Sequence, residues 1–539
     1  MASDFLWWRD GVIYQIYPRS YMDSNSDGIG DIPGITSRLD HLQDLGIDAI
    51  WLSAVYPSPN VDFGYDVSDY RGIHPQFGTL KDFDRLVLEA RRRGIHIIMD
   101  LVLNHSSDQH AWFQKSRQSA PNKYSDYYLW QLPKRGNKPP NNWLSVFGGP
   151  GWEFDEQRGE YYFHMFYKQQ PDLNWRNPRV RQEILDIFRF WADRGVDGFR
   201  LDVFNAYFKD KDFRDNPITP WGIRPFDRMR HLYDMDQPEL FEFIRELRSL
   251  LDAYPQSYVI GETFLGDQNT AAAYCAPGLL HAAFNFQFIS RIWKAHFYRK
   301  RELSWQAALH DHAWPALVLN NHDNPRSATR FGQGEDDARL KVAAAMLLSL
   351  RGTPFLYAGE EIGMRDIKVR REEVHDPIGK YYWPFFKGRD GCRSPMQWDG
   401  SKNAGFTTGN PWLRLHENYT KRNVGAQLAE HGSLLNFYKK MLALRRAVPA
   451  LHAGSLEMLN GLDQRVLGYS RQAGTSRVLV LLNFSSREVN LTLSGFEGQA
   501  SILLSSAERV GSVDLSPRLQ MSGNEALILE LPSTKQNNA

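Results

Sequence analysis

Short apolar runs alternate with amphipathic stretches along most of the chain. Residues 11–17, 48–53 and 95–102 are rich in Ile, Val, Leu and aromatic residues, which favours buried strands. Further apolar runs with the length of strands lie at residues 197–202, 257–262, 282–286, 316–320 and 354–357. Eight strand candidates separated by helical segments predict a parallel (β/α)8 barrel.

Helix signals punctuate the spaces between these runs. Thr79 with Asp82 three residues later resembles an N-terminal cap, and Gly94 marks the end of the same helix. A second helix ends at Gly46, and residues 180–194 form another candidate. These signals support the alternation of strands and helices.

Two regions depart from this rhythm. Residues 104–174 are rich in Pro, Gly, Asn and Trp, which predicts an inserted subdomain after the third strand. From residue 456 onward, short β-rich runs alternate with Gly and Ser turns, which predicts an all-β sandwich. We therefore expect a catalytic barrel of residues 1–103 and 175–455, the insertion, and a C-terminal domain of residues 456–539.

Composition narrows the class of protein. The 539 residues carry a net charge of +1, so no global field recruits nucleic acid or an acidic membrane. The longest strongly apolar run, residues 342–350, is far below membrane-spanning length. Cys275 and Cys392 do not make a disulfide framework, and residues 1–9 show no signal peptide, so we expect a cytoplasmic protein.

Charged residues gather where the predicted strands end. Arg200 and Asp202 share one face of a strand, and Arg200 favours the ionised form of its neighbour. In isolation such a pair is usually a structural ion pair. The strand ends also carry Asp62, Tyr65, Asp100, Asn104, His105, Glu262, His322 and Asp323. Because a barrel brings these ends to one site, the chain predicts grouped carboxylates, one protonated and one charged, as glycoside hydrolysis requires.

A polar loop follows the first strand. Asp23, Asn25, Asp27 and Asp31 place oxygen side chains at alternate positions, which suits a hard cation. The spacing matches the first nine positions of an EF-hand loop, but position twelve is Gly34 rather than Glu. The alternative is a turn rich in Asp and Asn.

Several segments resemble the α-amylase superfamily, glycoside hydrolase family 13. They are Asp100-Leu-Val-Leu-Asn-His105, Gly198-Phe-Arg-Leu-Asp202, Gly261-Glu262-Thr263 and Asn321-His-Asp-Asn324. Gln170-Pro-Asp-Leu-Asn174 and Arg393-Ser-Pro-Met-Gln-Trp398 further resemble the oligo-1,6-glucosidase and α-glucosidase subgroup, which more often has Thr at position 394.

The resemblance implies roles for individual residues. Asp202 is expected to be the nucleophile, Glu262 the general acid/base and Asp323 the third carboxylate. The residues expected to bind the terminal glucose are Asp62, Tyr65, His105, Gln170, Arg200, His322 and Arg393. Tyr65 is expected to stack on the sugar, and Asp62 with Arg393 to close the pocket. The expected metal ligands are Asp23, Asn25, Asp27, the Ile29 carbonyl and Asp31, holding one structural Ca²⁺ or Mg²⁺, with no organic cofactor.

The resemblance also implies an activity. We expect a retaining exo-α-glucosidase that acts on short α-glucosides through a β-glucosyl-enzyme, with some transglucosylation, as a monomer or homodimer. A sucrose isomerase or transglucosylase of the same subgroup is the alternative, and a catalytically silent binding or transporter-associated relative is a third. Val203 after the nucleophile tends to accompany α-1,6 activity in this subgroup, but the residues that follow differ, so the linkage stays open.

Overall fold

A parallel barrel forms the centre of the computed structural model, which describes residues 5–310, 313–334 and 336–532. Within these residues, eight parallel strands follow the order β10-β11-β1-β2-β3-β7-β8-β9, and a parallel bridge between Phe284 and Ala316 closes the ring. The strands are β1 (Ile13–Ile16), β2 (Ala49–Leu52), β3 (His96–Leu101), β7 (Gly198–Leu201), β8 (Tyr258–Gly261), β9 (Ala282–Ala283), β10 (Ala316–Val318) and β11 (Thr353–Tyr357). The predicted (β/α)8 barrel is confirmed.

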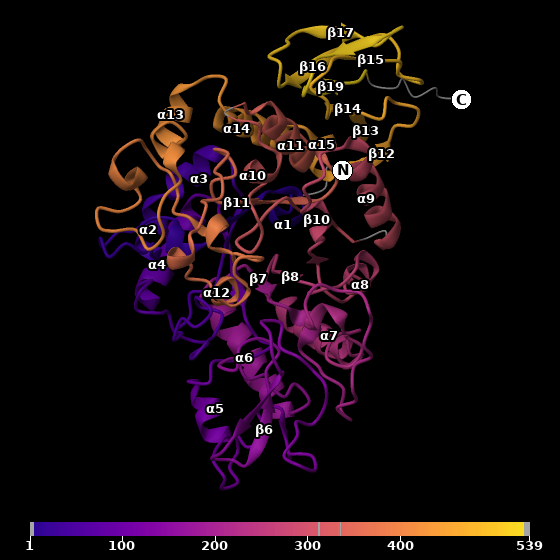
Figure 1. The fold of residues 1–539 in the computed structure, drawn as a ribbon. Coiled ribbons are helices and arrows are strands. Elements are labelled where there is room, and N and C mark those ends of the chain that lie inside the picture. The colour runs from indigo at the N-terminus through magenta and orange to yellow at the C-terminus, as the bar shows by residue number, and fades with distance from the viewer. Residues whose placement is uncertain (1–4, 311–312, 335, 533–539) are drawn as a thin grey trace.

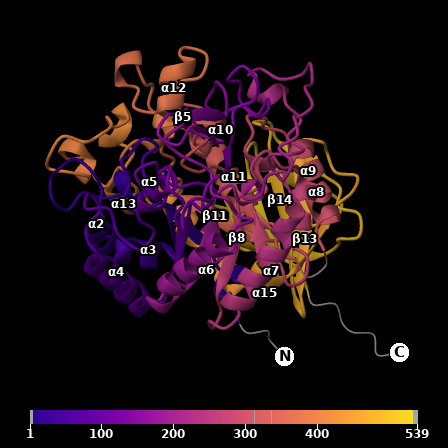
Figure 2. The same ribbon diagram turned by 90° about the horizontal axis from the view of Figure 1, so that it is seen from below.

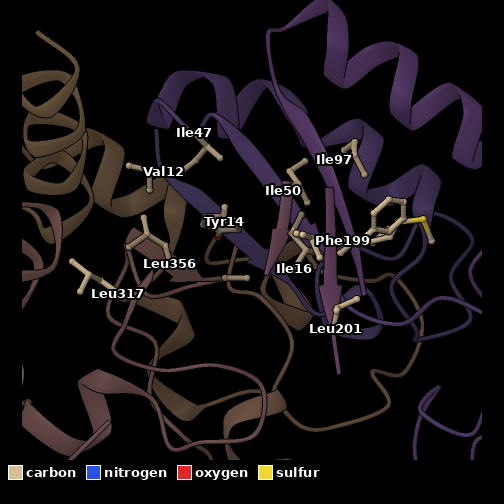
Figure 3. Close-up of a cluster of buried hydrophobic side chains, with 14 of the residues drawn as sticks. Val12, Tyr14, Ile16, Ile47, Ile50, Ile97, Phe199, Leu201, Leu317 and Leu356 are labelled. Atoms are coloured by element: carbon tan, nitrogen blue, oxygen red, sulfur yellow. The ribbon is translucent and has the colours of Figure 1, made fainter. Parts of the chain in front are cut away.

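Alternation along each strand separates two apolar layers. Ile13 and Trp51 point into the barrel and pack there with other inward side chains. Tyr14, Ile50 and Ile97 belong to the large cluster on the outer face, where the helices cover the sheet (Figure 3).

The helices surround the strands (Figure 1). They are α1 (Trp7–Asp10), α2 (Ile32–Ser37), α3 (Leu39–Leu45), α4 (Leu80–Arg92), α6 (Pro178–Asp193), α7 (Glu239–Leu251), α8 (Gln268–Ala273), α9 (Ala295–Ala308), α10 (Ser327–Phe331), α11 (Ala338–Ser349), α12 (Pro377–Tyr382), α13 (Val424–Ala429), α14 (Leu434–Ala447) and α15 (Pro449–Ala453). Thr79 and Asp82 form the expected capping box at α4. Gly46 ends α3 in the left-handed region, at φ 91°.

The insertion after β3 has its own small sheet. In the described residues it holds α5 (Ala111–Ser116) and three antiparallel strands in the order β4 (Trp130–Gln131), β6 (Glu160–Phe163) and β5 (Trp152–Asp155). Buried Lys209 lies in the loop after β7, and its Nζ is 2.5 Å from Asp172 Oδ2 and 2.7 Å from Asn104 Oδ1. This ammonium group ties the insertion to the barrel.

The C-terminal part is an antiparallel β domain, as expected. Among the described residues, six strands pair in the order β12 (Ser455–Met458), β13 (Val466–Ala473), β14 (Ser476–Asn483), β19 (Ala526–Glu530), β16 (Gln499–Ser505) and β17 (Ser512–Asp514), and β15 (Val489–Leu491) pairs with β18 (Leu519–Met521). Leu481, Leu491 and Met521 are part of the apolar cluster that joins the two sheets. Residues 533–539 of the predicted domain, like residues 1–4 of the N-terminal segment, lie outside the described residues.

The C-terminal domain and the insertion lie at opposite ends of the barrel (Figure 1). β13 contacts α9 and α15, and Figure 2 shows these elements side by side from below. Across the part of the chain that the structure describes, a search for a helix with the length and apolarity of a membrane span finds none.

Candidate active site

Arg200 on β7 is the centre of a group of carboxylates. Its Nη1 lies 2.6 Å from both Asp100 Oδ1 and Asp202 Oδ1, and its Nη2 donates to Glu262 Oε2. Register explains the grouping, because Arg200 pairs with Asp100 on β3 and with Ile260 on β8, two residues before Glu262. The guanidinium is 1% exposed. One buried cation therefore faces three acids from three neighbouring strand ends.

The two acids expected to react have different pKa values. Burial raises the pKa of Glu262 to about 8, although Arg200 acts against the rise. Burial also raises the pKa of Asp202, but only to about 6, again against the effect of Arg200. The proton therefore resides on Glu262 while Asp202 is ionised near neutral pH, which is the division of labour that an acid and a nucleophile need.

Asp323 completes the set from the loop after β10. Arg393 Nη2 lies 2.7 Å and Arg389 Nη1 3.3 Å from Asp323 Oδ1, and His322 Nε2 lies 3.4 Å from Oδ2. Burial acts against ionisation, but His322, Arg389 and Arg393 outweigh it and hold the pKa of Asp323 well below its usual range. This carboxylate stays charged throughout the neutral range.

Polar side chains from the loops after β2 and β10 and from the insertion lie beside the acids. Tyr65 Oη is 3.0 Å from Asp100 Oδ2, and its ring stacks on His322 at 5.5 Å. Gln170 Nε2 lies 3.1 Å from the Tyr65 carbonyl and 3.2 Å from His105 Nε2. The side chains of Tyr65, His105, Gln170 and His322 are all buried. The structure thus brings the expected sugar-binding residues around one site.

The partner of Asp62 differs from the expectation. Asp62 Oδ1 lies 2.7 Å from Arg389 Nη2, and the Arg389 Nε also donates to Asp376 Oδ2 at 2.9 Å. Arg393 instead bonds Asp323 and, through Nε at 2.8 Å, the carbonyl of His322. The direct ion-pair partner of Asp62 is therefore Arg389, and Arg393 acts on Asp62 without a direct ion pair. That Asp62 and Arg393 close a pocket stays a prediction.

Arg389 is the functional candidate that sequence reasoning missed. It precedes the short 3-10 helix Asp390–Arg393, four residues before the arginine that was matched. The available signal was a second arginine in the same segment, within reach of the acidic Asp376.

An aromatic wall stands next to this ion pair. The Phe147 ring centroid lies 5.9 Å from the Arg389 guanidinium, and the Phe166 ring lies 5.1 Å from His105. Phe147, Phe166 and Tyr167 also line a cavity of about 630 Å³ between the insertion and α12. Phe147 and Phe166 therefore contact both this cavity and residues of the charged site.

The loop of the expected metal site forms a ladder of side-chain to backbone hydrogen bonds. Asp23 Oδ1 accepts from the Asn25 N–H, Asn25 Oδ1 from the Asp27 N–H and Asp27 Oδ1 from the Ile29 N–H, at 2.8–2.9 Å. Asp31 caps α2 by accepting from the Gly34 N–H. In the part of the chain that is described, no three His, Cys, Asp or Glu side chains are arranged to hold a metal. The expected metal ligands are all oxygen atoms, as a hard cation prefers. The set is sufficient only if the Asn25 amide oxygen and the Ile29 carbonyl oxygen coordinate together with the carboxylates.

Known protein families match both the barrel with its insertion and the C-terminal domain. The family model of the α-amylase catalytic domain covers residues 15–454, and that of the maltogenic amylase C-terminal domain covers residues 456–523. A probable α-glucosidase of Rhizobium meliloti is 42% identical over 503 residues, covering 90% of each chain. An oligo-1,6-glucosidase of Parageobacillus thermoglucosidasius is 42% identical over 519 residues, covering 89% of this chain and 91% of the other.

Solved structures with the same architecture include an α-glucosyl transfer enzyme and a trehalulose synthase. The α-glucosyl transfer enzyme XgtA superposes with a TM-score of 0.93 at 40% identity, covering 98% of this chain and 100% of the other. The trehalulose synthase MutB of Pseudomonas mesoacidophila MX-45 gives a TM-score of 0.89 at 35% identity, covering 97% of this chain and 99% of the other.

Proposed function

The chain belongs to the α-amylase family of glycoside hydrolases, and from this premise we propose that it is a retaining, exo-acting α-glucosidase. The observation that carries the proposal is the pair of buried acids on Arg200. Burial leaves Glu262 with the higher pKa and Asp202 with the lower one, so one acid can donate a proton while the other attacks.

The reaction then proceeds in two displacements. Glu262 gives its proton to the glycosidic oxygen as an Asp202 oxygen bonds to the anomeric carbon, and the leaving group departs as an alcohol. The now ionised Glu262 takes a proton from water, whose oxygen attacks the same carbon and releases Asp202. Two inversions return α-glucose.

Arg200 stabilises the negative charge as it passes from Asp202 to Glu262. In the first step Glu262 becomes anionic while Asp202 loses its charge to the new bond. Because Arg200 contacts both carboxylates, its guanidinium stays paired with a negative group in each state. Asp323, which is ionised throughout, supplies the negative charge that stabilises an oxocarbenium-like transition state.

The ion pair of Asp62 and Arg389 supports exo action. Asp62 is buried, and Arg389 Nη2 lies 2.7 Å from its Oδ1. A sugar that extended past this pair would have to separate two buried charges, which is strongly unfavourable. We therefore propose that only a terminal glucose fits, with Tyr65, His105, Gln170 and His322 as donors and acceptors to its hydroxyl groups.

Transfer to a sugar acceptor is the second candidate. It is favoured by the TM-score of 0.93 with an enzyme described as an α-glucosyl transfer enzyme, and by the similarity to a trehalulose synthase. Transglucosylation and sucrose isomerisation use the same glucosyl-enzyme and differ only in what attacks it. A silent binding protein would not need Asp202, Glu262 and Asp323 assembled around three arginines.

The loop of residues 23–31 is proposed to hold one Ca²⁺ or Mg²⁺ through Asp23, Asn25, Asp27, Asp31 and the Ile29 carbonyl. Thr407 donates to Asp23 from a distant part of the chain, so an ion here would stabilise the junction of these loops. Its role in this proposal is structural.

Hydrolysis of p-nitrophenyl α-glucoside, followed by NMR of the newly released sugar, tests the proposal. We expect α-glucose to appear before β-glucose and expect Asp202→Asn to abolish release. Asp252→Asn, which changes an exposed acid paired with Arg248, is the control and should retain wild-type rates. No nitrophenol from the wild-type protein, or β-glucose as the first product, would refute the proposal. Product analysis on maltose, isomaltose, sucrose and trehalose separates hydrolysis from transfer.

A further inference from the structure

The buried amide side chain of Gln15 lies within the largely apolar interior of the barrel. Gln15 lies on β1 with the inward orientation of Ile13, beside the inward Trp51 of β2. It is 1% exposed. Its Nε2 lies 2.7 Å from His322 Nδ1 and 3.2 Å from Ser53 Oγ. A buried polar side chain in an apolar layer needs a reason, and its shortest contact is with a residue of the proposed glucose site.

The hydrogen bonds beyond His322 have a direction that Asp100 fixes. Asp100 is paired with Arg200, and as a carboxylate it can only accept. Tyr65 therefore donates its only hydroxyl proton to Asp100 Oδ2, at 3.0 Å. The Tyr65 oxygen lies 2.7 Å from His322 Nε2 and must accept from it. The proton of a neutral His322 is thus on Nε2, and its Nδ1 needs a donor, which is the Gln15 amide.

On this basis we propose that Gln15 is a positioning residue that holds His322 as the neutral tautomer protonated at Nε2. The proposal rests on the proposed function, because a His322 protonated at Nε2 fixes the direction of the Tyr65 hydroxyl group, and both residues are proposed to bind the glucose. In the other tautomer the lone pair of Nε2 would face the Tyr65 oxygen at 2.7 Å and Asp323 Oδ2 at 3.4 Å, which adds repulsion.

Two further observations agree with this assignment. Burial lowers the pKa of His322 to about 3, so the ring is neutral at working pH and its tautomer matters. Gln15 Oε1 has no hydrogen-bond partner within the described residues, whereas Nε2 contacts both His322 and Ser53, so the contacts of this amide are made by its nitrogen. The titratable and charged groups around the His322 ring are Asp323, Arg200, Arg389, Arg393, Tyr17 and Tyr65.

Substitution at position 15 tests the proposal. Gln15→Met keeps the length of the side chain without the donor, and we expect kcat/KM for p-nitrophenyl α-glucoside to fall about ten- to a hundredfold. The control is Ser53→Ala, which removes the other neighbour of the amide and should stay within about twofold of wild type.

Gln15→Glu gives a signature that a merely structural role does not produce. The new carboxylate can only accept a hydrogen bond from Nδ1–H, so a neutral His322 would take the wrong tautomer, whereas an imidazolium carries a proton on both nitrogens. We expect the kcat/KM of Gln15→Glu relative to wild type to fall at least about tenfold as the pH rises from 5.5 to 8, because the carboxylate raises the pKa of His322 into this range. A ratio constant within about twofold over this range would overturn the proposal.

A measurement on the wild-type protein decides the matter even if the variants do not fold or the chain proves to have another activity. With ¹⁵N-labelled histidine, the ring signals of His322 are identified by their loss in His322→Asn. We expect Nδ1 to resonate as an unprotonated nitrogen and Nε2 as a protonated one. The reverse pattern would show that Gln15 accepts rather than donates, and the proposal would be wrong.

Discussion

Replacing Arg389 with methionine leaves buried carboxylates without their cation. Its guanidinium lies 2.7 Å from Asp62 and 2.9 Å from Asp376, and it is 14% exposed. At 2.7 Å and an effective dielectric constant of about 20, the gross attraction to one carboxylate is about 6 kcal/mol. Desolvation offsets much of this, and removal of one partner of a buried pair typically costs about 3–5 kcal/mol.

The loss is large enough to follow by calorimetry. With an unfolding entropy of about 2.1 cal/mol/K per residue, unfolding of all 539 residues as one unit has an entropy of about 1.1 kcal/mol/K. A cost of about 3–5 kcal/mol then lowers Tm by about 3–5 °C, and by more if the barrel unfolds separately. We also expect kcat/KM for p-nitrophenyl α-glucoside to fall, because the closed end of the pocket depends on this pair.

Two variants control for general damage. Arg414→Met removes a half-exposed pair with Glu373, at 3.3 Å, and should change Tm by about 1 °C or less, with unchanged kcat/KM. Asp62→Asn in the Arg389→Met background removes one stranded charge, so the double variant should lose less stability than the sum of the two single variants. If Arg389→Met matches Arg414→Met in both assays, or if the losses simply add, the pair does not close the site as argued.

Three further outcomes follow from the structure. Because Asp202 must be ionised and Glu262 protonated, kcat/KM should fall below about pH 6 and above about pH 8, and Glu262→Gln should abolish the basic limb; a basic limb that persists in Glu262→Gln would contradict the assignment. Ca²⁺ or Mg²⁺ should raise Tm in scanning fluorimetry and Asp27→Ala should remove that response, whereas no effect of exhaustive chelation on Tm or metal content would leave the loop as a plain turn. Val203→Thr should change the ratio of kcat/KM for isomaltose to that for maltose by about 10- to 200-fold, which corresponds to about 1–3 kcal/mol, as measured by glucose release. An unchanged ratio would place linkage selection elsewhere.

The barrel could be predicted because its signals are local. Each strand is a short apolar run, and the cap of Thr79 or the stop at Gly46 is encoded within a few residues. The grouping of Asp202 and Glu262 also followed, because the fold itself brings the ends of parallel strands together.

The partner of Asp62 could not be predicted in the same way. Arg389 is 327 residues away along the chain, in a long segment without helical or strand periodicity. Which arginine of this segment reaches Asp62 depends on the path of the backbone through the 3-10 helix Asp390–Arg393. The stacking of the Tyr65 ring on His322 likewise depends on the three-dimensional assembly of the site, because the two residues are far apart along the chain.

The buried ammonium group of Lys209 bears on how a substrate would enter the site and a product would leave it. It joins the loop after β7 to Asn104 and Asp172 at the two ends of the insertion, with contacts of 2.5–2.7 Å. Swinging the insertion outward would strand this ammonium in an apolar interior, so the insertion is a fixed wall and not a hinged lid. With a fixed insertion and a pocket closed by Asp62 and Arg389, as proposed, we expect glucose to leave by the opening through which the substrate enters.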